Sequence, residues 1–101
     1  GVAPAAGAGA GAGTQVVQLP IQCTLADAET LKLRLVALLK STQPVIVDVG
    51  LVHRIDTASL QLLAAFAHER RSRDLAFGTT GASRVFAQAA RLLGLGAILG
   101  A

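Results

Sequence analysis

Residues 44–66 decide the fold of this chain, and they read PVIVDVGLVHRIDTASLQLLAAF. The stretch opens with a short apolar run, Val45–Val49, in which most side chains are β-branched and which is bounded by a proline and a glycine. Such a run is typical of a strand that is covered on both faces, as in a parallel sheet. Asp48 lies at the end of this strand with no catalytic partner near it in sequence, so we expect its carboxylate to bond N–H groups of the following loop.

A loop and an apolar helix follow this strand. Asp56, Thr57 and Ser59 favour a helix start, because their side-chain oxygens can accept the free N–H groups of the first turn. The helix is expected to run from Thr57 to about Arg71, and its first half is apolar almost all round. Gly50 opens the loop as a structural residue. The loop is at the long end of strand-to-helix connections, which usually have about 2–6 residues, and this length hints at function.

The segments on either side alternate strands and helices. Residues 14–23 predict an extended strand that is bent at Pro20 and lies at a sheet edge, because proline cannot donate to a ladder. Thr24 and Asp27 have capping-box spacing before a helix expected over residues 28–40. The later segments predict a strand over residues 75–77, a turn over residues 78–82, a helix that begins after Ser83 and ends before Gly94, and one more strand or helical turn over residues 95–99.

This order of elements predicts an α/β fold, in which helices pack against a small, mostly parallel β-sheet. The chain has 101 residues, enough for one domain, which we expect over residues 14–101. Residues 1–13 are almost all Gly and Ala and are expected to form a flexible tail. A folded part this small often depends on a partner.

The formal net charge of +3 makes nucleic acid the first class of partner to test. The basic residues cluster only at Arg70, Arg71 and Arg73, and the chain has no Tyr or Trp on which bases could stack. We interpret the cluster as a solvated helix end, where cations also suit the helix dipole, and expect no nucleic-acid partner.

Several other classes are not expected. The sequence has no run of about 18 large apolar residues and no signal-peptide pattern, so we expect no direct membrane insertion. The single cysteine, Cys23, cannot form a disulfide within the chain and fits a reducing cytosol, which predicts a cytoplasmic location. His53 and His68 lack ligand spacing with Cys23 or with each other, so no metal or other cofactor is expected.

Residues 45–66 resemble the central motif of the STAS family, the sulfate-transporter and anti-sigma-factor-antagonist domain. In that motif a β-branched strand ends in Asp, and a short loop leads to Asp-Ser/Thr-Ser/Ala-Gly-Leu at a helix start. The matching residues here are Asp48, Asp56, Thr57, Ala58 and Leu60. The resemblance extends over most of residues 14–101 and implies a STAS-type fold and a protein-binding module without catalysis.

The resemblance also implies a switch, with one departure. In sporulation-type antagonists, a kinase that is also the anti-sigma factor phosphorylates a serine at the second place after the motif Asp. Ala58 holds that place here and cannot be phosphorylated. Thr57 and Ser59 remain as candidate phosphorylation sites, because a phosphate at a helix start meets free N–H groups. Of these two, Ser59 is interpreted first as a first-turn hydrogen bonder and only second as a phosphorylation site.

The resemblance leaves three functions open: an anti-sigma factor antagonist-like regulator in bacterial signalling, the STAS subunit of a phospholipid-transport ABC system, and the cytosolic STAS domain of a sulfate transporter. The sequence Arg54–Ala58 is most similar to the second. The protein partner would then be an anti-sigma factor kinase, a signalling kinase or the ABC ATPase subunit. Such a partner could hold the chain at the inner membrane. A weak homodimer is a further alternative. All three functions imply one docking surface, formed by the loop Leu51–Asp56 and the first turns of the helix after it. Its candidate contacts are His53, Arg54, Asp56, Thr57, Ala58 and Ser59.

One pair of residues in the sequence could suggest an enzyme. Thr57 and His53, four residues apart, could be imagined as a nucleophile and its base, but no third group orients them. We therefore expect no enzymatic activity.

Overall fold

The computed structural model describes residues 13–100. The tail expected at residues 1–13 therefore lies, except for Gly13, outside the described residues. The elements along the chain are β1 (Gln15–Gln18), β2 (Gln22–Cys23), α1 (Leu25–Leu38), β3 (Val45–Asp48), β4 (Arg54–Ile55), α2 (Thr57–Ser72), β5 (Phe77–Thr80), α3 (Arg84–Leu92) and α4 (Gly96–Leu99).

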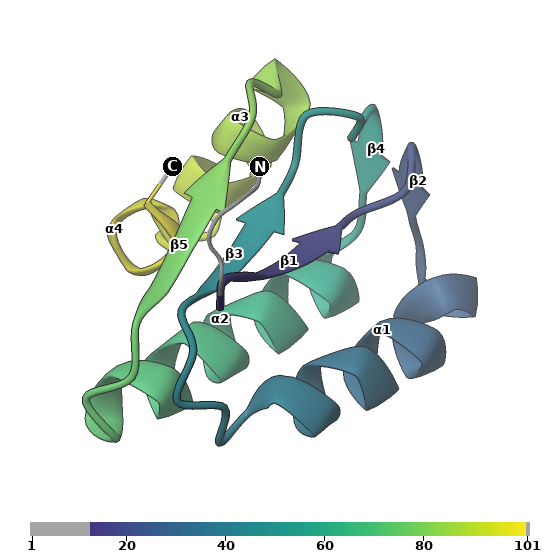
Figure 1. The fold of residues 1–101 in the computed structure, drawn as a ribbon. Coiled ribbons are helices and arrows are strands. Elements are labelled where there is room, and N and C mark those ends of the chain that lie inside the picture. Colours follow the sequence, from purple (N-terminus) through teal and green to yellow (C-terminus); the bar gives the residue numbers. More distant parts are fainter. Residues whose placement is uncertain (1–12, 101) are drawn as a thin grey trace.

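Three parallel strands form the main sheet, in the order β1-β3-β5 (Figure 1). The central strand is β3, and its Val47 lies in register between Val17 of β1 and Thr79 of β5. A separate pair, β2 with β4, is also parallel. The α/β fold with a parallel sheet is confirmed, and so are the edge position of the first strand and its interruption around Pro20.

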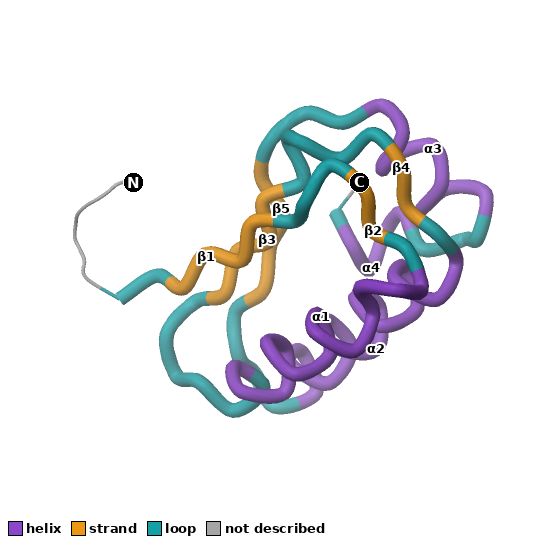
Figure 2. Tube along the Cα trace, turned by 90° about the vertical axis from the view of Figure 1, so that its right-hand side faces the viewer, coloured by secondary structure: helices purple, strands orange, loops and turns teal. Residues whose placement is uncertain are grey.

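The helices lie on one side of the main sheet, as Figure 2 shows. Val45 and Val47 point to that side and are fully buried, whereas Ile46, between them, is only partly buried. Val16, in register with Ile46, is 59% exposed. The expectation that the central strand is covered on both faces is therefore wrong for the described residues, because alternate side chains of β3 point to an open face.

The last strand begins later than expected. Phe77–Thr80 pair with β3, so the strand includes three of the residues expected in the turn. A Cβ atom at Gly78 would lie 3.3 Å from Ile46 Cδ1, so the glycine leaves room for the Ile46 side chain opposite it. Leu75 and Ala76 instead belong to the connection from α2, where Leu75 N donates to Arg70 O at 2.8 Å. Pairing with the neighbouring strand decided the boundary, and local composition did not.

The helix boundaries follow the predicted caps. Helix α1 begins at Leu25, directly after Thr24 and earlier than expected, but the predicted capping box does not form: the Thr24 side chain accepts no backbone N–H, and its hydroxyl donates to Asp27 Oδ2 at 3.3 Å. The Ser83 side chain accepts from Phe86 N at 3.1 Å at the start of α3, and Gly94 has a φ of +71° after its end, as C-cap spacing predicts. Residues Gly96–Leu99 form a helix, which is one of the two alternatives, strand or helical turn, expected for residues 95–99.

The interpretation of Arg70 as a solvated residue is wrong. Its side chain is fully buried, and its guanidinium donates to four carbonyl oxygens, those of Leu38, Ser41, Gln43 and Ala76. These carbonyls lie at the end of α1 and on the segments that lead into β3 and β5. Burial lowers the pKa of Arg70. Arg70 therefore joins three segments at the lower edge of the sheet, while Arg71 and Arg73 remain exposed.

Candidate functional site

The turn that begins the loop after β3 lies against the backbone of Gly81, at the upper edge of the sheet. The Asp48 Oδ1 atom accepts from Gly50 N at 2.9 Å, which is the role expected for that carboxylate. Gly81, after β5, packs directly on this turn: a Cβ atom there would lie 2.7 Å from both Asp48 Oδ1 and Gly50 N. Its φ of +87° is in the left-handed region that favours glycine. The sequence showed Gly81 only as part of a turn.

The second half of the loop is fixed by the segment before α1. His53 N and Arg54 N both donate to Ile21 O, at 2.8 and 3.1 Å, and Asp56 N donates to Cys23 O at 3.0 Å. The pairing of β2 with β4 continues this anchoring. Backbone hydrogen bonds to residues 21–23 thus anchor the second half of the loop. No local sequence pattern indicated this anchoring.

Asp56 and Ser59 together build the start of α2. The Asp56 Oδ1 atom accepts from Ser59 N at 2.9 Å, so Asp56 is the N-cap residue as predicted. This backbone hydrogen bond is the main reason that the pKa of Asp56 is lowered, and nearby Arg54 adds to the effect. The Ser59 hydroxyl donates to Cys23 O at 3.2 Å, and Ser59 is only 1% exposed. Burial argues against Ser59 as a contact or a phosphorylation site, because a kinase or partner cannot reach its hydroxyl.

The remaining predicted site residues come together on the outside. Thr57, His53 and Arg54 are exposed, and Ala58 is half-buried. Leu51, the first residue of the loop that was expected to form this surface, is 45% exposed. We call the following set the docking surface: Leu51, His53, Arg54, Asp56, Thr57 and Ala58.

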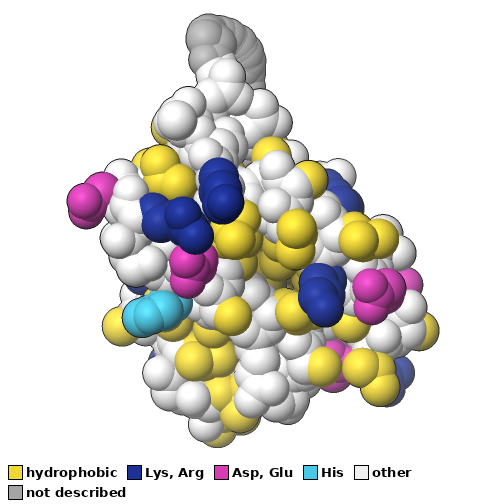
Figure 3. All heavy atoms as spheres, turned by 90° about the horizontal axis from the view of Figure 1, so that it is seen from below, with side chains coloured by type: hydrophobic (Ala, Val, Ile, Leu, Met, Phe, Trp, Pro, Cys, Tyr) yellow, Lys and Arg dark blue, Asp and Glu magenta, His cyan; other side chains and the backbone are white. Residues whose placement is uncertain are grey.

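The docking surface borders a groove between α1 and α2. This groove, of about 380 Å³, has small apolar side chains along it, Ala58 and Ala65 from α2 and Ala28 from α1, and Lys32 at its side. A second hollow of about 320 Å³ continues it along the same two helices and shares Lys32 and Ala65 with it. Figure 3, which views the molecule from below, shows hydrophobic side chains interspersed with charged ones on this face.

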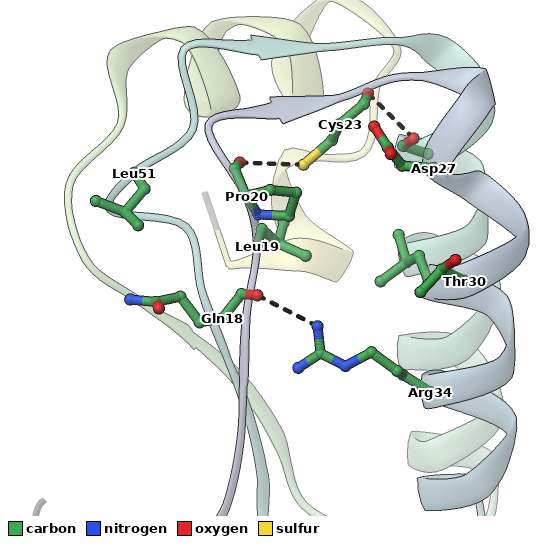
Figure 4. Close-up of a pocket in the computed structure, with 10 residues that line it drawn as sticks. Gln18, Leu19, Pro20, Cys23, Asp27, Thr30, Arg34 and Leu51 are labelled. Atoms are coloured by element: carbon green, nitrogen blue, oxygen red, sulfur yellow. Dashed lines mark hydrogen bonds between the residues drawn. The ribbon is translucent and has the colours of Figure 1, made fainter.

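A pocket of about 380 Å³ lies where Leu19 and Pro20 face α1, and Leu51 of the docking surface also lines it (Figure 4). Arg34 of α1 donates to Gln18 O at 3.4 Å across this pocket. Cys23 lies in the same place, and burial raises the pKa of its thiol to about 11, with the charges of Asp27 and Asp56 adding to the rise. The thiol is therefore protonated at neutral pH and suits a packing role.

The ring of His53 is engaged by the loop backbone and not by Thr57. His53 Nδ1 lies 3.0 Å from Leu51 O, so the ring bonds the loop backbone, and no hydrogen bond joins it to Thr57 in the structure of residues 13–100. Within the same residues, no group of three His, Cys, Asp or Glu side chains could hold a metal ion. None of the helices in that range is both long and apolar enough to cross a membrane.

Comparisons with known proteins agree with this architecture. The family model described as "Mlab, STAS domain" matches residues 8–100, while a search of curated proteins found no match. Among solved structures, the chain is similar to a sulfate transporter family protein from Wolinella succinogenes, with 20% sequence identity and a TM-score of 0.68. That likeness covers 86% of this chain and 71% of the other, and at such low identity it concerns the fold alone. The family match covers most of the chain, and the protein therefore belongs to the STAS family.

Proposed function

We propose that this STAS domain is a non-catalytic module that binds a protein partner through the docking surface. The observation that carries the proposal is the exposed Thr57 at the start of a capped helix, beside a loop whose backbone is held at both ends. Because His53, Arg54 and Asp56 all bond Ile21 or Cys23 through their backbone N–H groups, the surface exists before a partner arrives. A preformed surface loses less conformational entropy on binding.

The local geometry favours constitutive docking over a serine switch. Ala58 stands at the place of the usual phosphorylated serine, and the next hydroxyl, that of Ser59, is buried against Cys23 O. These features, together with the Arg54–Ala58 sequence, support the STAS subunit of a phospholipid-transport ABC system as the more specific role, with its ATPase as the partner.

A second role, as an anti-sigma factor antagonist-like regulator bound by a kinase, is supported by one observation. Thr57 is exposed, and its hydroxyl lies at a helix N-terminus where a phosphate would meet free N–H groups. A phosphate there would add close to two negative charges to the docking surface and would weaken a contact that excludes water.

Site-specific photo-crosslinking tests the proposal. A photoreactive amino acid is placed at Thr57 in cells that produce the protein, and a matched variant carries it at Thr42, which is exposed in the connection between α1 and β3. We expect one protein to be captured from position 57 and not from position 42. An ABC ATPase subunit would support the first role and a kinase the second. Equal capture from both positions, or none from position 57, would contradict the docking surface.

A further inference from the structure

The docking surface continues onto the start of α3, where the chain places a further cation. Residues 75–100 contain two arginines and not a single Asp or Glu. One of these arginines, Arg84, is exposed and is the first residue of α3. A cation at this end of a helix opposes the helix dipole, and the first turn of α3 contains no acidic residue to offset it. Helix stability therefore gives no reason for Arg84.

The fold brings Arg84 to the same edge as Arg54. The neighbouring Ser83 hydroxyl donates to Val52 O, in the loop of the docking surface, at 2.7 Å. Helix α3 also lies against β4, to which Arg54 belongs, and Figure 1 shows both at the upper edge of the molecule. His53 is exposed between these two contacts. His53 and Arg54, which are consecutive, and Arg84 of α3 thus come to one edge from two separate segments.

The carboxylates of this edge are already engaged. Asp48 accepts a hydrogen bond from Gly50 N, and Asp56 accepts one from Ser59 N, so one carboxylate oxygen of each residue is bonded to the backbone. The hydrogen bond from Ser59 N is the main cause of the lowered pKa of Asp56, and Arg54 only adds to it without forming an ion pair. Within residues 13–100 the one ion pair between side chains is Arg73 with Glu69, at the far end of α2. Asp48 and Asp56 keep their negative charge, but the exposed guanidinium groups of Arg54 and Arg84 are in no ion pair within that range and can contact carboxylates of a partner.

We propose that the partner presents an acidic protein surface to this edge, with Arg54 and Arg84 as its two charged contacts. This inference rests on the proposed docking function and deepens it by naming the chemistry of the partner. Opposite charge across an interface speeds association and excludes partners of like charge. A protein surface is favoured over nucleic acid because the chain has no Tyr or Trp for base stacking.

Charge reversal at two edges tests this inference. The probe is the protein captured by the crosslinker at position 57, purified and titrated with the wild type, with Arg54→Glu/Arg84→Glu, and with Lys40→Glu/Arg73→Glu. The last variant has the same net charge but carries its changes where α1 and α2 end, at the opposite edge. Kd and the association rate are measured between about 50 and 500 mM NaCl, a range over which screening becomes severe. Thermal melts confirm that each variant is folded.

We expect the Arg54/Arg84 variant to lose about tenfold or more in affinity at low salt, mainly through slower association, and to lose its salt dependence. The Lys40/Arg73 variant should stay close to the wild type. Equal weakening of both variants would overturn the inference, because net charge alone would then explain the effect. An unchanged Kd in the Arg54/Arg84 variant would also overturn it. If Thr57→Glu still abolishes binding in that case, the docking surface stands and only its acidic partner is refuted.

Discussion

The packing of Gly81 against the loop of the docking surface predicts a large and specific cost for Gly81→Ala. An alanine at a φ of +87° would incur about 1–2 kcal/mol from the left-handed conformation alone. Its Cβ would also lie 2.7 Å from Gly50 N and 2.9 Å from Gly50 Cα, which are backbone atoms that cannot rotate away. Crowding of that kind costs about 1–3 kcal/mol more, so the total is about 2–5 kcal/mol.

Gly94→Ala is the matched control. Gly94 has a similar φ of +71°, but nothing lies within 4 Å of the Cβ it would gain. Its substitution should therefore cost only the conformational part, about 1–2 kcal/mol. The difference between the two variants isolates the contact of Gly81 with Gly50 and Asp48.

Urea denaturation measures both costs. With a slope of about 1–3 kcal/mol per M for a domain of this size, Gly81→Ala should unfold at a midpoint about 1 M lower than Gly94→Ala. Amide resonances of residues 48–52 should also shift in Gly81→Ala and stay in place in Gly94→Ala. Equal free energies of unfolding for the two variants would refute the reasoning, because the close approach of the two loops would then contribute nothing.

Three further predictions concern buried or titrating groups. Arg70→Met should lower the free energy of unfolding by about 3–5 kcal/mol in urea denaturation, because four carbonyls lose a charged donor; a cost like that of Arg73→Met would contradict the network. Because the pKa of Asp56 is lowered in the folded protein, its carboxylate stabilises the fold fully above the unfolded pKa of about 4, and this contribution is lost as the pH falls through the folded pKa. The difference in free energy of unfolding between the wild type and Asp56→Ala should therefore stay constant from about pH 5 to 7 and shrink below about pH 4. Cys23, with a pKa of about 11, should react with a thiol reagent at pH 8 far more slowly in the native protein than in urea; equal rates would show that the thiol is accessible.

The sequence predicted those features that depend on neighbours along the chain. Asp56, Ser83 and Gly94 mark helix ends through local hydrogen bonds or backbone conformation, and the structure places the helix ends beside them. The parallel order of strands followed from the alternation of strands and helices. Asp48 and Asp56 bond the backbone N–H groups that their positions suggested.

The features that were missed depend on residues far apart in sequence. Arg70 belongs to a basic cluster, and only the fold brings it to carbonyls about thirty residues away, at Leu38 and Ser41. Ser59 is similar, since its buried hydroxyl donates a hydrogen bond to Cys23 O, 36 residues away in sequence. The open face of β3 could not be seen in an apolar run, because β-branched residues suit both faces of a strand.

The most direct test of the account is the affinity of the captured partner for Thr57→Glu, compared with the matched variant Thr42→Glu. A glutamate in the first turn of α2 suits the helix dipole, so the protein should remain folded while the docking surface gains a negative charge. The account predicts that Thr57→Glu weakens binding by about 30-fold or more, as at an interface hot spot, and that Thr42→Glu leaves it within about twofold of the wild type. A Thr57→Glu variant that is folded and binds as tightly as the wild type would contradict the central claim.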